Sequence, residues 1–76
     1  MLSDAVEAVE VVDDSPEADD FFEMARSYLE DGERFLAKDD EVNALAAFSY
    51  GHAWLDAGVR VGFFEIKDGK EGLFAA

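Results

Sequence analysis

Apolar residues recur at helical spacing along most of the chain, and their pattern predicts three helices. Over residues 16–37, apolar side chains fall on one side of a helix and charged side chains fall on the other. Residues 41–61 form a second apolar-rich segment, and residues 1–14 form a weaker one rich in valine. Valine is β-branched and lowers helix propensity. We therefore expect a helical hairpin over residues 15–62, preceded by a weak N-terminal helix or a disordered arm.

Capping residues mark the ends of both hairpin helices. Ser15 precedes Pro16, a pair typical of an N-cap followed by a first helical turn, where the missing N–H of proline is not needed. The run Lys38-Asp39-Asp40 places a cation at the end of one helix and capping carboxylates before the next, and Gly62 is a stop signal after the second. Because the connection between the helices is short, they must be antiparallel neighbours.

Small residues repeat every seven positions on both helices. The repeats consist of Ala18, Ala25 and Gly32 on the first helix and Ala44, Gly51 and Gly58 on the second. A glycine inside a helix costs about 1 kcal/mol relative to alanine, and close packing of the two backbones would offset that cost. We expect small residues to face small residues along this seam. The predicted fold class is all-α, resembling a three-helix bundle, with residues 63–76 as a C-terminal tail that either folds back or stays mobile.

Acidic residues dominate the charge of the chain. Nineteen Asp and Glu stand against six Lys and Arg, for a formal charge of −13, although half of the residues are hydrophobic. That apolar content argues against disorder, so the acids must coat a folded core. The few cations form no basic stripe, and we expect no nucleic-acid binding. An acidic surface poor in lysine is typical of proteins that work in molar salt, which predicts a halophilic source.

Other classes of protein are disfavoured by what the sequence lacks. It contains no cysteine, so disulfides, thiolate metal sites and a thiol nucleophile are excluded. No stretch is apolar enough to span a bilayer, and the first residues do not resemble a secretion signal. We expect a cytoplasmic protein with no membrane contact and no cofactor.

One segment, Tyr50-Gly51-His52-Ala53-Trp54-Leu55-Asp56, concentrates the residue types that carry chemistry. His52 and Asp56 are four residues apart on one helical face, a spacing that would let the carboxylate orient the imidazole. No nucleophile, oxyanion hole or second histidine accompanies them, so we expect a surface His–Asp pair and no catalytic residue. The alternative is a small-ligand or metal site centred on His52 and Asp56, to which Tyr28 would contribute.

The aromatic residues allow a similar choice. Trp54 and Tyr28 could frame an aromatic pocket, and Tyr50 lies on the same helix as Trp54. An aromatic residue between the two glycines of a seven-residue repeat more often belongs to a hydrophobic core. We therefore treat Tyr28, Tyr50 and Trp54 as candidates for ligand or partner contact, with core packing as the simpler interpretation.

Two stretches carry a family resemblance. The run from Tyr50 to Gly58 is similar to the Tyr-Ala-His-Gly-Trp-Leu-Asp-Ala signature of an archaeal family, domain of unknown function 357, with Ala and Gly exchanged at two positions. The run Tyr28-Leu29-Glu30-Asp31-Gly32-Glu33-Arg34-Phe35-Leu36 also matches, and the resemblance covers roughly residues 15–66. It implies a small helical-hairpin or three-helix domain of archaeal origin, with no established activity.

The second helix has more apolar surface than the first can cover. One arc consists of Ala46, Tyr50, Ala53, Trp54, Ala57 and Val61, with no acid among them. A solvated face would carry charge in a protein this acidic. We expect a homodimer in which Ala46, Tyr50, Ala53, Ala57 and Val61 form the interface, with a foreign protein partner as the other possibility. The predicted function is a non-enzymatic interaction or assembly module.

Overall fold

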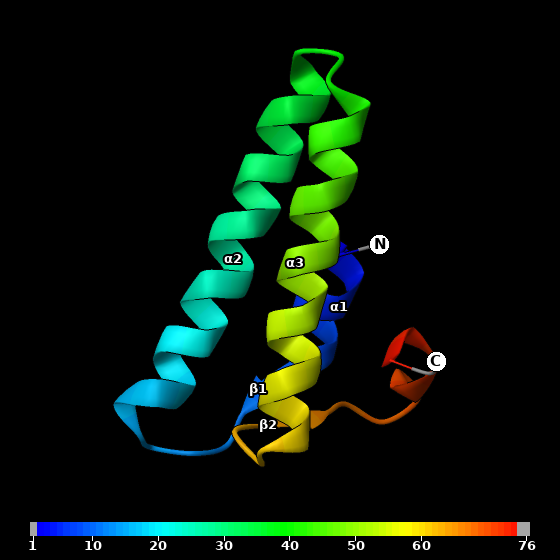
Figure 1. The fold of residues 1–76 in the computed structure, drawn as a ribbon. Helices are drawn as coiled ribbons and strands as arrows, with labels where there is room; N and C mark the ends of the chain where they lie inside the picture. Colours follow the sequence, from blue (N-terminus) through cyan, green and yellow to red (C-terminus); the bar gives the residue numbers. More distant parts are fainter. Residues whose placement is uncertain (1, 75–76) are drawn as a thin grey trace.

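The computed structural model describes residues 2–74 and is built on a long helical hairpin (Figure 1). A short helix and a two-stranded sheet pack against the hairpin near its open end. In chain order the elements are α1 (Leu2–Ala8), β1 (Val9–Val11), α2 (Pro16–Ala37), α3 (Glu41–Arg60), β2 (Phe64–Ile66) and the short 3₁₀ helix η1 (Glu71–Phe74).

The hairpin helices begin at the expected capping residues. Ser15 Oγ accepts a hydrogen bond from the N–H of Ala18 at 3.2 Å, and Asp40 Oδ1 accepts one from Asn43 at 3.2 Å. The Ser15 N–H donates in turn to Asp13 Oδ1 at 2.7 Å, and this bond lowers the pKa of Asp13. These side chains satisfy N–H groups that have no partner inside a helix.

The ends of α2 and α3 also follow the sequence closely. Helix α2 spans the expected residues. Helix α3 ends at Arg60, one residue earlier than expected, with Val61 as its C-cap. Gly62 follows with φ 87°, and Asp39 in the connection has φ 60°. Both residues are in the left-handed region, where glycine is least strained and aspartate is among the more tolerant side chains.

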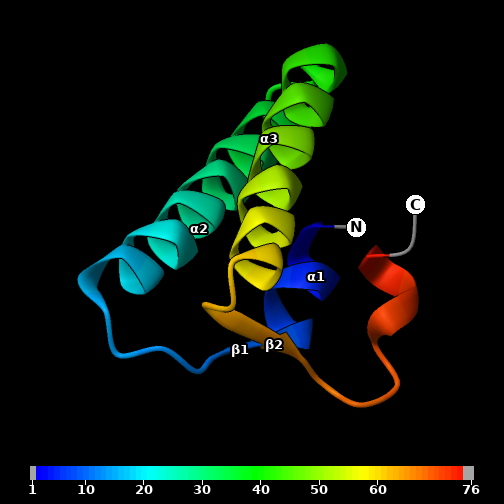
Figure 2. The same cartoon turned by 60° about the horizontal axis from the view of Figure 1, so that its bottom comes forward.

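The all-α expectation is wrong at the open end of the hairpin, where β1 pairs antiparallel with β2 (Figure 2). Val9 lies opposite Ile66, and Val11 lies opposite Phe64. The bonds Lys67 N–H to Ala8 O, at 2.7 Å, and Val12 N–H to Phe63 O, at 3.0 Å, extend the pairing at both ends. Alternating valine and glutamate suits a strand with one face on the core, and the C-terminal segment supplies its partner.

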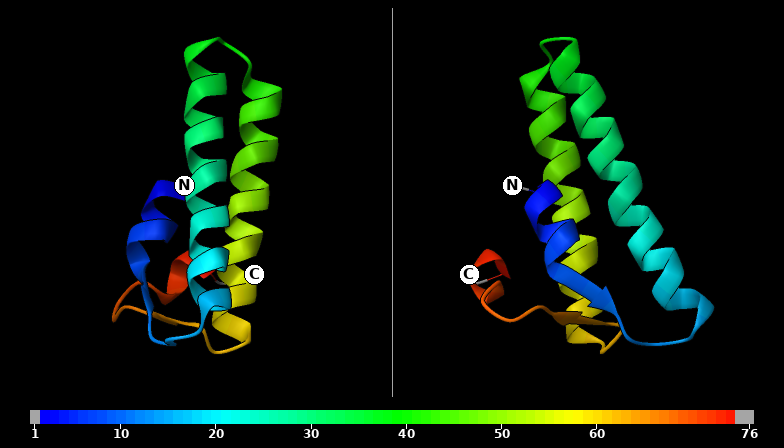
Figure 3. Two further views of the ribbon diagram at one scale, coloured as in Figure 1. Left: turned by 90° about the vertical axis from the view of Figure 1, so that its left-hand side faces the viewer. Right: turned by 180° about the vertical axis from the view of Figure 1, so that it is seen from behind.

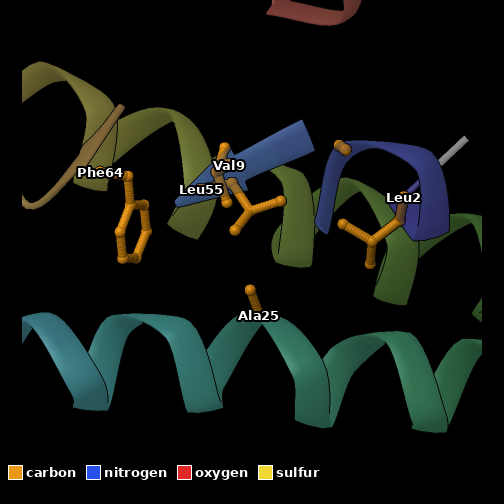
Figure 4. Close-up of a cluster of buried hydrophobic side chains, with 6 residues drawn as sticks. Leu2, Val9, Ala25, Leu55 and Phe64 are labelled. Carbon is orange, nitrogen blue, oxygen red and sulfur yellow. The ribbon is translucent and has the colours of Figure 1, made fainter. Parts of the chain in front are cut away.

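The hydrophobic core lies where α1, β1, α2, α3 and β2 meet (Figure 4). Leu55 of α3 is fully buried there, with 0% of its surface exposed, and the labelled side chains around it come from α1, β1, α2 and β2. The buried cluster consists of Leu2, Ala5, Val9, Ala25, Leu55 and Phe64. Residues 2–11 therefore complete the core, and of the two expected alternatives, a weak helix or a disordered arm, the structure has a helix followed by a strand.

The six small residues of the seam are all buried, but they do not simply face one another. A Cβ on Gly32 would collide with the ring of Phe48, and one on Gly58 would collide with the ring of Phe64. Gly51 alone of the three lies against the backbone of the facing helix: an added Cβ would lie 3.3 Å from the backbone oxygen of Ala25. The same Cβ would also lie 2.5 Å from Leu2 Cδ2. Two of the three glycines therefore make room for aromatic rings.

Candidate functional site

His52 is held by the C-terminal tail. Its Nε2 lies 3.0 Å from the backbone oxygen of Leu73, a geometry in which the imidazole N–H donates to the carbonyl. Its ring also packs against Phe74, with centroids 5.2 Å apart and planes inclined by 33°. The back view in Figure 3 shows the tail returning beside α1. The half-buried histidine is thus an anchor for η1, and it is not the surface residue that the expected His52–Asp56 pair requires.

Asp56 contacts a different residue from the one expected. Its Oδ2 accepts a hydrogen bond from Arg60 Nε at 2.9 Å, one turn further along α3. Both His52 and Arg60 are four residues from Asp56, but the imidazole of His52 binds the backbone oxygen of Leu73 in the tail. The expected His52–Asp56 surface pair is therefore replaced by an Asp56–Arg60 pair. Across residues 2–74, no three His, Asp or Glu side chains converge as a metal ion would require.

Tyr28 and Trp54 belong to two separate aromatic contacts. Trp54 packs edge-to-face on Phe21 of α2, with centroids 4.9 Å apart and planes at 82°. Phe21 also contacts Phe63, which ties this pair to the start of the tail. Tyr28 packs instead against Tyr50 at 5.8 Å. The two residues do not jointly frame a pocket, and both take part in packing between α2 and α3.

An apolar face of α3 remains open to solvent. It is formed by residues spaced three or four apart, and we call it the α3 face: Val42, Ala46, Tyr50, Ala53, Ala57 and Val61. Val42, Tyr50 and Val61 are 81%, 62% and 60% exposed, and Ala46 and Ala53 are exposed as well. Figure 1 shows α1 and the sheet behind α3, with no other segment in front of it.

A shallow apolar groove of about 280 Å³ runs along this face, lined by Tyr50, Ala53, Trp54 and Ala57. The structure thus groups most of the residues expected at an interface. Val42 extends the face by one turn toward the start of α3, and the sequence analysis missed it. Continuing the four-residue step back from Ala46 would have identified it.

The comparisons with known proteins give one result. A family model described as "Protein of unknown function (DUF357)" matches residues 1–64. The chain belongs to the DUF357 family. No match was found among curated proteins or among solved structures. The family model extends through α1, β1, α2 and α3 and ends at the first residue of β2, so it includes the whole α3 face of this DUF357 member.

The part of the tail after Phe64, which binds His52, lies beyond the residues matched by the DUF357 model. It also forms one wall of an open hollow of about 770 Å³ beside α1, which the sequence analysis did not anticipate. Its lining residues are Asp4, Glu7, Ala8, Lys67, Gly69, Lys70, Gly72 and Leu73. Because two acids and two lysines share this lining, it favours neither anions nor cations. No helix within residues 2–74 is both long and apolar enough to cross a membrane.

Proposed function

We propose that this DUF357 chain is a non-enzymatic helical assembly module that forms a homodimer through the α3 face. The observation that carries the proposal is the composition of that face: six apolar residues and no acid, on a chain with a net charge of −13. A contiguous row of exposed apolar residues on a small domain is typical of a protein–protein contact. Covering Tyr50 and Val61 would remove apolar area from water and stabilise the assembly.

The geometry favours assembly over the alternative of a ligand or metal site at His52 and Asp56. The imidazole of His52 is engaged by the tail, and the carboxylate of Asp56 is engaged by Arg60. Neither group is directed with the other toward a shared ligand. The α3 face, in contrast, is not covered by any segment of residues 2–74. Because it is one side of a straight helix, another helix can pack against it.

The proposed homodimer requires high salt. Two acidic chains repel each other in dilute buffer, and molar salt screens this repulsion over distances of roughly 3 Å. We place the protein in the cytoplasm of a halophilic archaeon, where such salt would be present. The acidic surface and the scarcity of lysine support this placement.

Light scattering behind a sizing column in molar KCl tests the proposal. The wild-type chain should have twice the 8.4 kDa mass of one protomer. Ala53→Glu places a carboxylate at the centre of the face and should produce a monomer, because a buried unpaired charge opposes association. Ser27→Glu adds the same charge at an exposed position of α2 and should remain dimeric. A monomeric wild-type protein in molar salt would refute the homodimer.

A further inference from the structure

The spacing of the α3 face is the same in both directions along the helix. From Val42 to Val61 the steps are four, four, three, four and four residues, and both ends read valine then alanine. Rotating α3 by 180° about an axis perpendicular to it, between Tyr50 and Ala53, superposes the pattern on itself. On the proposed homodimer, we infer that the second copy of this chain binds with its α3 antiparallel to the first, about this twofold axis.

In this register, each position of one helix lies opposite a defined position of the other. Val42 lies opposite the partner's Val61, Ala46 opposite the partner's Ala57, and Tyr50 opposite the partner's Ala53. Large residues therefore face alanine at the centre, and small residues face each other on either side. Alanine contacts allow helix axes to approach to roughly 8 Å, the short end of the range for packed helices.

The groove on the face has the geometry that this register needs. Its four lining residues, Tyr50, Ala53, Trp54 and Ala57, stand at positions i, i+3, i+4 and i+7 of α3. Four residues in this arrangement form the hole that receives one side chain of a facing helix in knobs-into-holes packing. The antiparallel register brings the partner's Tyr50 to the level of Ala53, over this hole. Tyr50 is 62% exposed and its ring packs on one side against Tyr28, so this side chain is available as that knob.

Charge at the two ends of the helix selects the antiparallel orientation. Asp40 and Glu41 stand at the start of α3, and Arg60 stands at its end with a side chain that is 75% exposed. The antiparallel register places Arg60 beside the partner's Glu41, and the helix dipoles then oppose each other favourably. The guanidinium carries five N–H donors, so it can bind this second carboxylate while Nε–H stays on Asp56. A parallel arrangement would place like charges together at both ends.

Disulfide trapping tests the register, because the chain has no cysteine of its own. Under mild oxidation in molar KCl, Ala53→Cys should give a covalent dimer, since both copies lie next to the axis. Ala46→Cys and Ala57→Cys should each stay uncross-linked alone, because self-pairing would need to span about 16 Å along the helix. A mixture of these two variants should cross-link, as their Cα atoms would fall within the roughly 4.4–6.8 Å of a disulfide. Ser27→Cys, on the exposed side of α2, is the negative control.

The outcomes separate this inference from the proposed function. Cross-linking of Ala46→Cys with itself would overturn the antiparallel register and leave the homodimer standing. A dimer by light scattering with no cross-link at any of the three α3 positions would likewise overturn the register, since the twofold axis would lie elsewhere. A monomer by light scattering would refute the homodimer and the register together.

Discussion

The two helices of the hairpin differ in how their surfaces are used. The 22 residues of α2 include seven acids, Glu17, Asp19, Asp20, Glu23, Glu30, Asp31 and Glu33, whereas the 20 residues of α3 include two, Glu41 and Asp56. On α2 most apolar residues face the core and the opposite side is mostly charged, although Met24 and Leu36 are 38% and 42% exposed. On α3 a buried side and an exposed side are both apolar. The fold explains most of the pattern of α2, but it leaves the apolar α3 face uncovered.

This uncovered face is what makes α3 the candidate for function. An exposed helix surface that only keeps a domain in solution would resemble the charged side of α2. The side of α3 that maintains the fold and the side left for a partner should respond differently to substitution. The stability measurements use the Ala53→Glu background, so that association does not contribute to unfolding.

The largest effect is expected at Leu55, which is fully buried where five elements meet. Leu55→Ala should destabilise the domain by about 2–5 kcal/mol, because it removes apolar contacts and leaves a cavity. Leu45→Ala is the matched control on the same helix: Leu45 is 68% exposed, and its truncation should change stability by less than about 0.5 kcal/mol. Urea unfolding followed by circular dichroism measures both. Equal losses at the two positions would contradict the assignment of the buried side.

A smaller loss is expected at Gly58, which makes room for the ring of Phe64. Gly58→Leu should cost about 1–3 kcal/mol, since the ring must move and carries β2 with it. Gly58→Ala should cost less. Gly72 in η1 has no atom within 4 Å of an added Cβ, so Gly72→Leu is the control and should have little effect on the urea midpoint. A stabilised Gly58→Leu variant would show that this part of α3 is not packed against the tail.

His52 should affect the tail more than the hairpin. His52→Ala removes the hydrogen bond to Leu73 and the packing on Phe74, a loss of about 0.5–1.5 kcal/mol for the hydrogen bond. The expected result is faster trypsin cleavage after Lys70, with little change in helix content. Asp56→Ala breaks only an exposed pair with Arg60 and should leave cleavage at the wild-type rate. Equal acceleration by both variants would indicate that His52 and Asp56 act as a pair after all.

Salt is expected to act chiefly through α2, which carries most of the helical acids. Raising KCl from dilute to molar should raise the Tm, because screening reduces repulsion among its carboxylates. A gain of about 1 kcal/mol would shift the Tm by roughly 4–8 °C in a domain of this size. Neutralising two acids of α2 with Asp20→Asn and Glu30→Gln should lessen this dependence. A Tm that does not change with salt would contradict the argument from charge.

Much of the hairpin was predictable because its signals are local. Ser15 and Asp40 cap the helices that follow them, and Gly62 adopts the positive φ expected after a helix. The helical spacing of apolar and charged residues predicted which side of α2 is buried. The acid-free arc of α3 can also be recognised from the sequence alone. These features depend on residues at most a few positions apart, so helix geometry by itself relates them.

The tertiary structure alone decided the rest. The sequence does not show which segment pairs with the valines of residues 9–11. In the folded chain residues 64–66 lie beside them, and pairing with this distant strand is favoured over continuing a weak helix. His52 and Arg60 are equally spaced from Asp56 along α3, so spacing alone does not decide which of them pairs with it. In the folded chain His52 binds Leu73 of the tail, and Arg60 pairs with Asp56. Gly32 and Gly58 were recognisable as packing residues, but not as spaces for Phe48 and Phe64. Except for Phe64, which follows Gly58 by six residues, each of these partners is remote in sequence, and only the folded chain brings them together.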